Sequence, residues 1–331
     1  MTRFAYFGGH EQFQPETLVA HARAAEEAGF DMVMVSEHFN PWVDDHGGAG
    51  FAFSTLGAMA AATQRIELVT GVTTPLFRFH PAIVAQAAAT LDRLSGGRFT
   101  LGVGTGENIN EGPLGYVFPA YAERAARMTE ALEIMRRLLD GERLNYAGTY
   151  YQTKQSRLYS PPLHRVPIWM ACGGPRSAVL ASKLADGIIV SVKAVDAALA
   201  EVVEPVQAAA KRGGRPPLTV VTTRWSILAD SDDEAWQALL AWRGLRAPGR
   251  LQAVDPAQLR IAADALPRSE VLSRYSRATE PAQLIDIYKP LVDEVKADVV
   301  TFQITSIDQT STIRRLGQEV LPALRAIAAT P

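Results

Sequence analysis

Residues 31–42 read DMVMVSEHFNPW, an apolar run of strand length that passes directly into a polar and aromatic segment. An uninterrupted apolar run of this kind is typical of a strand that is buried on both faces, as in a parallel sheet covered by helices. The pattern recurs along the chain, and most runs are followed by a segment with helical spacing of apolar residues. The strands predicted in this way are residues 3–8, 31–36, 66–72, 98–103, 167–171, 186–191, 218–227 and 298–304.

The segments between these runs predict helices, and the first of them begins at Pro15 and ends at Gly29, the usual asymmetry of helix ends. Eight strand–helix pairs favour a closed (β/α)8 TIM barrel of the α/β class. A doubly wound sheet is the alternative, but no glycine fingerprint follows the first strand. The predicted helices are residues 15–29, 81–94, 119–140, 175–184, 195–212, 232–243, 281–294 and 309–328.

We found no internal repeat, low-complexity tract or linker, so the sequence predicts one domain over residues 1–331. The segment of about 229–280 is long for one strand–helix connection. We therefore expect an insertion after the seventh strand, partly covering the mouth of the barrel.

The composition excludes several classes of function. The net charge of −2 provides no bulk field for nucleic acid or an anionic membrane. Cys172 is the single cysteine, and the six histidines include no H-E-x-x-H pair, so neither a disulfide within the chain nor a metal site is predicted. No apolar run approaches the roughly 18 residues of a membrane span, and the sequence opens without an apolar signal region, so we expect a cytoplasmic protein.

Chemistry in such barrels sits at the carboxyl ends of the strands. His38 follows the second strand directly, and we interpret it as a candidate catalytic base. The neighbouring Glu37 carboxylate can hold the ring and raise its proton affinity. A structural or cofactor-orienting role is the alternative reading of this histidine.

Other polar and glycine residues follow the remaining strands. Glu107, after the fourth strand, is either an exchanger of protons with a cofactor or a solvated or helix-capping carboxylate. Glu11 is a further candidate after the first strand. Trp42 is either a packing residue or a flat ring that stabilises a cation. Gly173-Gly174, before a predicted helix, either present N–H groups to a phosphate or form an ordinary turn.

Three segments at these positions resemble the glucose-6-phosphate dehydrogenases that use coenzyme F-420, a deazaflavin. The segments are SEHFNPW (36–42), TPLFRFHPAIVAQAAATL (74–91) and GVGTGENINE (102–111). The shorter matches ACGGP (171–175), ADGIIVSVK (185–193) and AADALP (262–267) extend the resemblance over nearly the whole chain. That family lies within the luciferase-like barrels, many of which use FMN instead.

The resemblance implies a deazaflavin ring in the barrel mouth and a non-prolyl cis peptide between Gly71 and Val72. It also implies that the histidine takes the proton of the anomeric hydroxyl while a hydride passes from the anomeric carbon to the deazaflavin. Glu107 would then protonate the reduced ring, Trp42 would stabilise charge on the sugar, and Glu11 would help to hold it. The implied cofactor contacts are Glu37, His38, Gly71, Val72, Thr74, Glu107, Asn110, Cys172, Gly173 and Gly174.

The family holds the substrate phosphate with three basic residues, which the resemblance maps to Lys193, Arg250 and Arg274. Arginine can bind a phosphate through two hydrogen bonds, whereas lysine acts as a point charge. Each basic residue alone is also compatible with a solvated surface side chain. All three positions are basic, so the combination favours a phosphosugar substrate.

The sequence departs from the family at Glu37, where aspartate is usual, at Cys172, where alanine is usual, and over residues 243–258. The sugar therefore stays open, and another 6-phosphosugar or a non-phosphorylated alcohol is an alternative. Rival functions are an FMN-dependent monooxygenase or flavin reductase, an F-420-dependent secondary-alcohol dehydrogenase or pterin reductase, and a cofactor carrier or sensor without turnover. The resemblance also implies a homodimer formed through helices near the second and third strands, such as residues 81–94.

Overall fold

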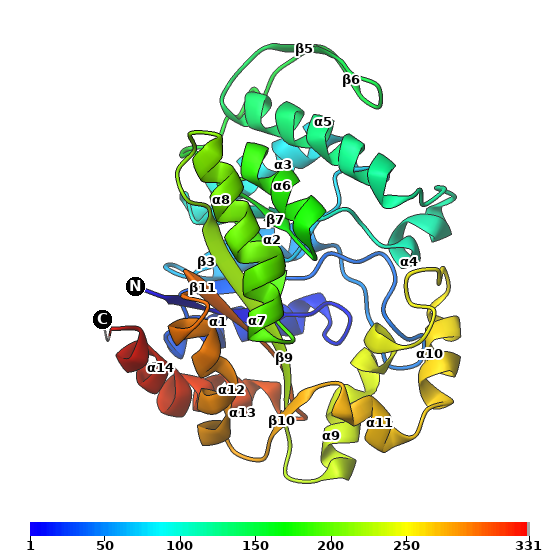
Figure 1. The fold of residues 1–331 in the computed structure, drawn as a ribbon, viewed down its shortest axis with the longest axis vertical. Coiled ribbons are helices and arrows are strands. Elements are labelled where there is room, and N and C mark those ends of the chain that lie inside the picture. Colours follow the sequence, from blue (N-terminus) through cyan, green and yellow to red (C-terminus); the bar gives the residue numbers. More distant parts are fainter. Residues whose placement is uncertain (330–331) are drawn as a thin grey trace.

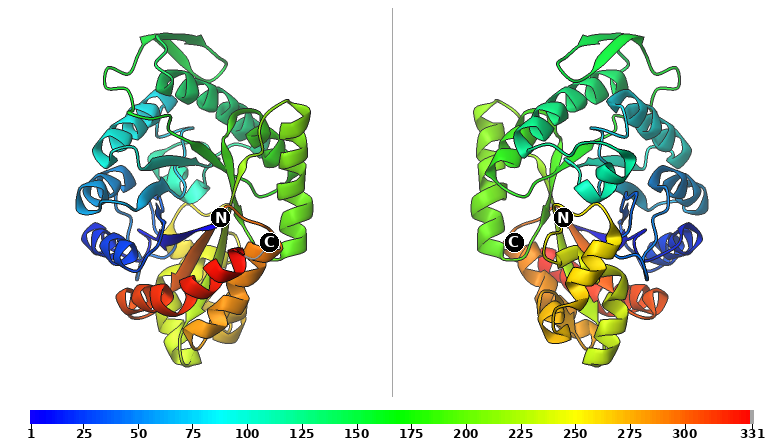
Figure 2. Two further views of the ribbon diagram at one scale, coloured as in Figure 1. Left: turned by 90° about the vertical axis from the view of Figure 1, so that its left-hand side faces the viewer. Right: turned by 90° about the vertical axis from the view of Figure 1, so that its right-hand side faces the viewer.

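Within residues 1–329, which the computed structural model describes, eight parallel strands close into a barrel surrounded by helices (Figure 1, Figure 2). Pairing of β8 with β9 closes the ring. This confirms the predicted TIM barrel and excludes a doubly wound sheet. The strands are β1 (Arg3–Gly8), β2 (Met32–Val35), β3 (Glu67–Thr70), β4 (Phe99–Val103), β7 (Ile168–Ala171), β8 (Gly187–Ser191), β9 (Thr219–Leu228) and β11 (Val299–Thr305).

The helices around the barrel lie close to the predicted positions. The predicted helix 195–212 is divided into α7 (Val195–Ala198), a π-helical turn (Leu199–Val203) and α8 (Glu204–Arg212). A second π-helical turn, Leu316–Val320, divides the last predicted helix in the same way. The surrounding helices are α1 (Pro15–Glu27), α3 (Pro81–Ser95), α5 (Tyr121–Leu139), α6 (Pro175–Leu184), α12 (Pro281–Asp293), α13 (Gln309–Arg315) and α14 (Leu321–Ala328).

Outside the insertion, the elements that were not predicted include a helix and a hairpin. Helix α2 (Ala52–Ala62) contains no charged residue, so it lacks the polar face that marks an amphipathic helix in a sequence. The hairpin of β5 (Leu144–Ala147) and β6 (Gln152–Ser156) is short, polar and partly exposed, so it lacks the apolar run of a buried strand.

The strands are buried on both faces because alternate residues belong to two separate hydrophobic clusters. In β1, Phe4 and Tyr6 belong to the cluster that includes residues of the surrounding helices, such as Leu18. Ala5 and Phe7 belong to a second cluster, which fills the barrel and continues into the insertion. This arrangement explains why the strands read as continuous apolar runs rather than as alternating patterns.

The segment after β9 covers one side of the barrel mouth (Figure 1). It contains α9 (Asp232–Leu239), a 3-10 helix (Leu240–Arg246), α10 (Pro256–Asp264), α11 (Arg268–Ser273) and β10 (Ser276–Ala278). The predicted helix 232–243 therefore ends earlier, at Leu239, and continues as the 3-10 helix. Residues 330 and 331, the end of the predicted domain, lie outside the described part of the chain.

Close packing attaches this insertion to the barrel. The Trp242 ring lies so close to Gly9 that a Cβ there would overlap it, and Trp242 Nε1 donates a hydrogen bond of 2.6 Å to Gln12 Oε1. The buried Arg243 guanidinium pairs with Asp45 at 2.6 Å and Asp264 at 2.7 Å. The insertion is thus held in a defined position over the strand ends.

Over the described residues 1–329, we find no helix that is both long enough and apolar enough to cross a membrane.

Candidate active site

Two adjoining cavities lie at the carboxyl ends of the strands. The first, which we call the strand-end cavity, has a volume of about 1030 Å³ and is lined by all ten residues expected to contact a cofactor. The second, which we call the basic cavity, has a volume of about 1090 Å³ and contains Lys193, Arg250 and Arg274 in its wall. Arg250 and Trp225 line both cavities, so the two form one continuous site.

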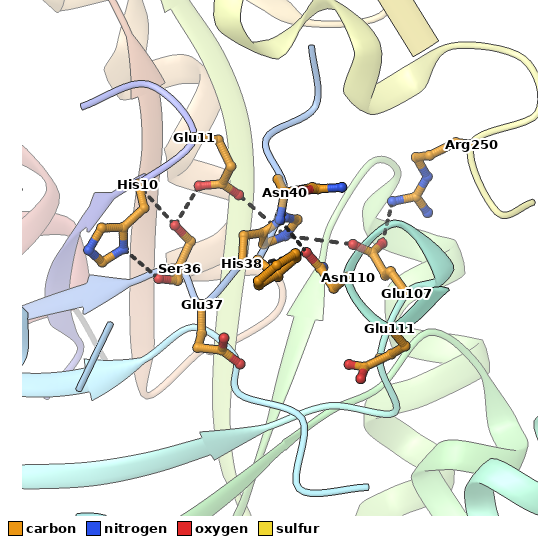
Figure 3. A network of polar contacts seen from close by, with 12 residues as sticks. His10, Glu11, Ser36, Glu37, His38, Asn40, Glu107, Asn110, Glu111 and Arg250 are labelled. Carbon is orange, nitrogen blue, oxygen red and sulfur yellow. Dashed lines mark hydrogen bonds and ion pairs between the residues drawn. The ribbon is translucent and has the colours of Figure 1, made fainter. Parts of the chain in front are cut away.

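His38 lines the strand-end cavity and lies between two carboxylates, Glu107, which also lines the cavity, and Glu11, which is buried beside it (Figure 3). Its Nε2 is 3.4 Å from Glu11 Oε1 and 3.7 Å from Glu107 Oε2. Its Nδ1 lies 3.0 Å from the carbonyl oxygen of Asn40, which can only accept a hydrogen bond. Nδ1 therefore carries the proton in the neutral ring, and Nε2 is left free to accept one.

The expectation that Glu37 holds His38 is wrong. Glu37 bonds to both the Arg78 guanidinium, at 2.6 Å, and the Thr73 hydroxyl, at 3.0 Å, and its carboxylate points away from the histidine (Figure 3). Neighbouring side chains of an extended segment point to opposite sides, which separates residues 37 and 38. The carboxylates beside His38 come from other strand ends, at Glu11 and Glu107.

Glu11 is held in place from the first two strand ends. The Ser36 hydroxyl donates a hydrogen bond of 2.5 Å to Glu11 Oε2 and accepts one of 2.8 Å from the His10 N–H. The His10 ring is buried and bonds to the Ser36 carbonyl at 2.7 Å. This network leaves Glu11 Oε1 directed at His38 (Figure 3).

Trp42 lies behind His38 and in neither cavity wall. Its ring packs edge-on against the histidine at 4.8 Å between centroids, and the Arg250 guanidinium lies 5.6 Å from its centre. The side chain is only 3 % exposed, and its Nε1 has no hydrogen-bond partner among the described residues. Trp42 thus supports both His38 and Arg250, while its role in stabilising charge on the sugar remains a prediction.

Arg78 joins two buried carboxylates below the cavity. It pairs with Glu37 and with Glu111, and the Glu111 side chain is fully buried. Burial, opposed by the Arg78 charge and reinforced by the Glu37 charge, raises the pKa of Glu111 to about 7. One guanidinium between two carboxylates leaves an excess negative charge, which protonation of Glu111 removes.

Glu107 connects the two cavities electrostatically. Its Oε1 accepts a hydrogen bond of 2.7 Å from Arg250 Nη1, while its Oε2 faces His38 (Figure 3). Asn110, one helical turn later, accepts hydrogen bonds from the N–H groups of Phe39 and Asn40 at 2.9 and 3.2 Å. These bonds tie the segment after β4 to the segment after β2.

The segment after β7 forms the opposite wall. The N–H groups of Gly173 and Gly174 lie 3.2 and 3.3 Å from Ser177 Oγ, so in this structure they cap the start of α6. Cys172 is buried, and burial raises the pKa of its thiol to about 12. The thiol is therefore protonated at neutral pH and is a packing group rather than a nucleophile.

The strand-end cavity has features of a cradle for a flat ring. The peptide bond between Gly71 and Val72 is cis, as the resemblance implied. A Cβ on Gly104 would lie 2.6 Å from Val72 Cγ2, so glycine is needed for Val72 to line the cavity. Gln303 Oε1 is buried in its wall without a hydrogen-bond partner among residues 1–329, which leaves an acceptor for a ligand.

Sequence reasoning missed several lining residues. Trp225 and Gln303 lie within strands predicted only for their apolar character. Arg246 lies in the insertion, where the sequence departs most from the family that it resembles. The signal available for Arg246 was its position four residues before Arg250, which alone does not place both side chains in one cavity.

The family model for luciferase-like monooxygenase matches residues 1–300. The chain belongs to this family. Within it, the chain is 36% identical to the F-420-dependent glucose-6-phosphate dehydrogenase of Nakamurella multipartita, over 98% of this chain and 97% of the relative. It is also 37% identical to the F-420-dependent hydroxymycolic acid dehydrogenase of Mycobacterium tuberculosis, over 96% of this chain and 86% of the relative.

A solved structure of an F-420-dependent secondary alcohol dehydrogenase in complex with an F-420–acetone adduct superposes with a TM-score of 0.91. It is 28% identical to this member of the luciferase-like family and covers 98% of this chain and 99% of its own. Overall identity therefore does not separate relatives named for a sugar phosphate from those named for other alcohols. The residues of the two cavities must make that distinction.

Proposed function

We propose that this protein is an F-420-dependent dehydrogenase that oxidises the anomeric carbon of glucose 6-phosphate or a related 6-phosphosugar to the lactone. The observation that carries the proposal is the junction of the two cavities. His38 and Glu107 face the strand-end cavity, and Lys193, Arg250 and Arg274 line the adjoining basic cavity. Relatives named as F-420-dependent dehydrogenases support the same reading.

The strand-end cavity fits a deazaflavin. Val72, Thr74 and Gly104 form one wall, Cys172 and Gly173 form another, and Gln303 offers a free buried acceptor. A deazaflavin bound there would supply the acceptor for the hydride that leaves the alcohol carbon. FMN, the less favoured alternative, would occupy the same cavity.

His38 would act as the base toward the anomeric hydroxyl. Its Nδ1–H is committed to the Asn40 carbonyl, so Nε2 is the atom that takes the proton. Glu11, at 3.4 Å, would stabilise the imidazolium that forms, and Glu107, at 3.7 Å, would take up its proton. Such positioned proton transfer contributes about 100- to 10,000-fold to a rate.

Glu107 would supply a proton to the cofactor ring, since it lines the strand-end cavity and lies on the same side as His38. Trp42 would stabilise charge near the reacting sugar through its contact with His38. Glu11 would help to hold the sugar through the oxygen that is not bonded to Ser36. These roles are expectations for the individual side chains.

The basic cavity would hold the substrate phosphate. Arg250 and Arg274 would offer phosphate oxygens the N–H groups that their contacts with Glu107 and Glu270 leave free, and Lys193 adds a point charge. Lys193 is exposed and makes no ion pair with the described residues, so it is available to a ligand. A non-phosphorylated alcohol would bring no anion to this basic cavity, which disfavours an alcohol dehydrogenase of that kind.

The test is a substrate panel with the purified protein and oxidised coenzyme F-420, followed by loss of deazaflavin fluorescence. We expect loss with glucose 6-phosphate or with fructose or mannose 6-phosphate, and none with simple alcohols. Loss with alcohols alone would favour an F-420-dependent alcohol dehydrogenase. Tight binding of FMN without binding of the deazaflavin would contradict the proposal and favour a monooxygenase.

The same proposal includes a homodimer formed through α2 and α3. An apolar groove runs between these helices and includes Phe51, Phe79, Ile83 and Leu94. Ile83 and Leu94 are 55 and 60% exposed. An exposed apolar patch of this kind is unfavourable in water and is typical of a surface that contacts another protein chain. Light scattering should give twice the chain mass for the natural protein and a monomer for Ile83→Asp, and a monomer in both would contradict the dimer.

A further inference from the structure

Arg246 stands out among the basic residues of the barrel mouth. It ends the 3-10 helix of the insertion and lines the basic cavity beside Arg250 and Arg274. Its guanidinium carbon lies 4.3 Å from the centre of the Tyr275 ring. Tyr275 is buried, and its hydroxyl donates a hydrogen bond of 3.1 Å to the Trp242 carbonyl, so the platform under Arg246 is rigid.

Arg246 has no counter-charge in the described structure. Arg250 pairs with Glu107 and Arg274 pairs with Glu270, both at 2.7 Å, but no carboxylate of residues 1–329 forms an ion pair with Arg246. Partial burial, together with repulsion by Arg250 and Arg274, lowers the pKa of Arg246, although attraction from Tyr275 opposes this. The mutual repulsion of these three arginines therefore favours the binding of an anion in the basic cavity.

The backbone also ties Arg246 to its neighbour. The Arg246 carbonyl accepts a hydrogen bond of 2.5 Å from Arg274 Nη1, while Nη2 of the same guanidinium bonds to Glu270. Arg274 is thus held by contacts within the protein at two nitrogens, and Arg250 is held by Glu107. Of the three arginines, Arg246 is the one whose guanidinium makes no hydrogen bond to another described residue.

We propose that Arg246 is a further substrate-binding residue and that it determines specificity for the dianionic form of a terminal phosphate. This inference rests on the proposed function and names the feature of the substrate that the basic cavity selects. Of the four basic residues that line the basic cavity, Lys193 and Arg246 have no ion-pair partner among residues 1–329, since Arg250 and Arg274 are paired with carboxylates. The lining carboxylate, Glu201, is exposed and pairs with neither. Two unpaired positive charges match a phosphate monoester, which carries a charge of about −1.5 to −2 at neutral pH.

The cavity therefore favours a dianion over a singly charged group. A monoanion would neutralise only one of the two unpaired positive charges, those of Lys193 and Arg246. The planar guanidinium of Arg246, which lies over the Tyr275 ring, can give two parallel N–H donors to phosphate oxygens.

The first experiment measures anion binding by calorimetry on the enzyme loaded with coenzyme F-420. The probes are inorganic phosphate and dimethyl phosphate, which is a permanent monoanion. The variants are Arg246→Gln, Arg246→Lys and the matched control Arg268→Gln, which lies in the same insertion and outside both cavities. Circular dichroism checks that each variant is folded.

We expect the natural protein and Arg268→Gln to bind phosphate at least 10-fold more tightly than dimethyl phosphate. Arg246→Gln should weaken phosphate binding about 10-fold, which is the effect of losing one charge-assisted hydrogen bond. Its affinity for phosphate should therefore exceed its affinity for dimethyl phosphate by a smaller factor than in the natural protein. Arg246→Lys should fall between them, because it keeps the charge and loses the planar donors. A general structural defect would weaken the binding of both anions equally and would leave the ratio of their affinities unchanged.

The inference would be overturned if the natural protein and Arg246→Gln bound phosphate equally tightly. It would also be overturned if the ratio of phosphate affinity to dimethyl phosphate affinity were the same in both proteins. Turnover separates this failure from failure of the proposed function. If phosphosugars reduce the cofactor but the ratio does not change, only the role of Arg246 is lost. If no phosphosugar reacts but Arg246→Gln still narrows the ratio, the dianion site stands and the proposed function is lost.

Discussion

The two cavities of this barrel are built in different ways. The strand-end cavity is lined by residues that follow β2, β3, β4 and β7 directly, so the barrel itself positions them. The basic cavity takes Arg246, Arg250 and Arg274 from an insertion that is attached to the mouth by side-chain packing. The proposed function therefore assigns the chemistry to residues that the barrel positions and the selection of the substrate to the insertion. Variants in the first cavity should therefore lower kcat, and variants in the second should raise KM.

The largest effect is expected for His38→Ala. Removing Nε2 removes the acceptor for the substrate proton, so kcat should fall about 1,000-fold while F-420 binding persists. Stopped-flow cofactor reduction and a fluorescence titration measure the two quantities. His164→Ala, an exposed histidine far from either cavity wall, serves as the control. A near-normal kcat for His38→Ala would show that His38 is not the catalytic base.

Glu107→Gln should lower kcat about 100-fold, because the amide can neither take up a proton from His38 nor supply one to the cofactor ring. KM should change less, although Arg250 loses its ion pair with Glu107. Steady-state kinetics with glucose 6-phosphate separates the two parameters. The exposed Glu142→Gln is the matched control. A change in KM alone would place Glu107 in substrate binding rather than in proton transfer.

Arg274→Ala tests the basic cavity. KM for the phosphosugar should rise about 10-fold, and kcat should fall much less, because the lost contact is made equally in the ground state and the transition state. Arg268→Ala, on the neighbouring helix α11, should leave both parameters unchanged. If kcat and kcat/KM fell equally and KM did not rise, Arg274 would act in the chemical step, and the basic cavity would not be the site of substrate binding alone.

The smallest effect on turnover is expected from the charge below the strand-end cavity. The raised pKa of Glu111, about 7, means that between pH 4.5 and 7 the folded protein binds more protons than the unfolded chain. The free energy of unfolding therefore decreases as pH rises through this window, by about 3 kcal/mol from this group. Thermal melts should show this fall in the natural protein and a flatter profile in Glu111→Gln. Parallel profiles would show that Glu111 is ionised throughout.

The sequence predicted the strand-end cavity well because a residue that directly follows a parallel strand must lie at the barrel mouth. This reasoning places His38 and Glu107 without knowledge of any long-range contact. It failed for the partner of Glu37, since side-chain direction within an extended segment depends on the exact end of the strand. The ion pair between Arg78 and Glu37 joins residues 41 positions apart, and no local pattern indicates it.

The insertion was less predictable for a related reason. Its position was recognised from its length, but its internal helices are short, and the predicted helix 232–243 ends at Leu239. Arg246 reaches the basic cavity because Tyr275, 29 positions later by residue number, forms the surface under it. A contact of this kind depends on packing between segments, which the sequence periodicity of either segment does not contain.

The most direct test of the account is to follow deuterium from glucose 6-phosphate labelled at the anomeric carbon during a single turnover with F-420. We expect mass spectrometry to find the deuterium in the reduced cofactor. His38→Ala should slow this transfer, and the deuterium should still appear in the reduced cofactor. Unlabelled reduced cofactor, or reduction at the same rate without any phosphosugar, would contradict hydride transfer between a phosphosugar held in the basic cavity and a deazaflavin in the strand-end cavity.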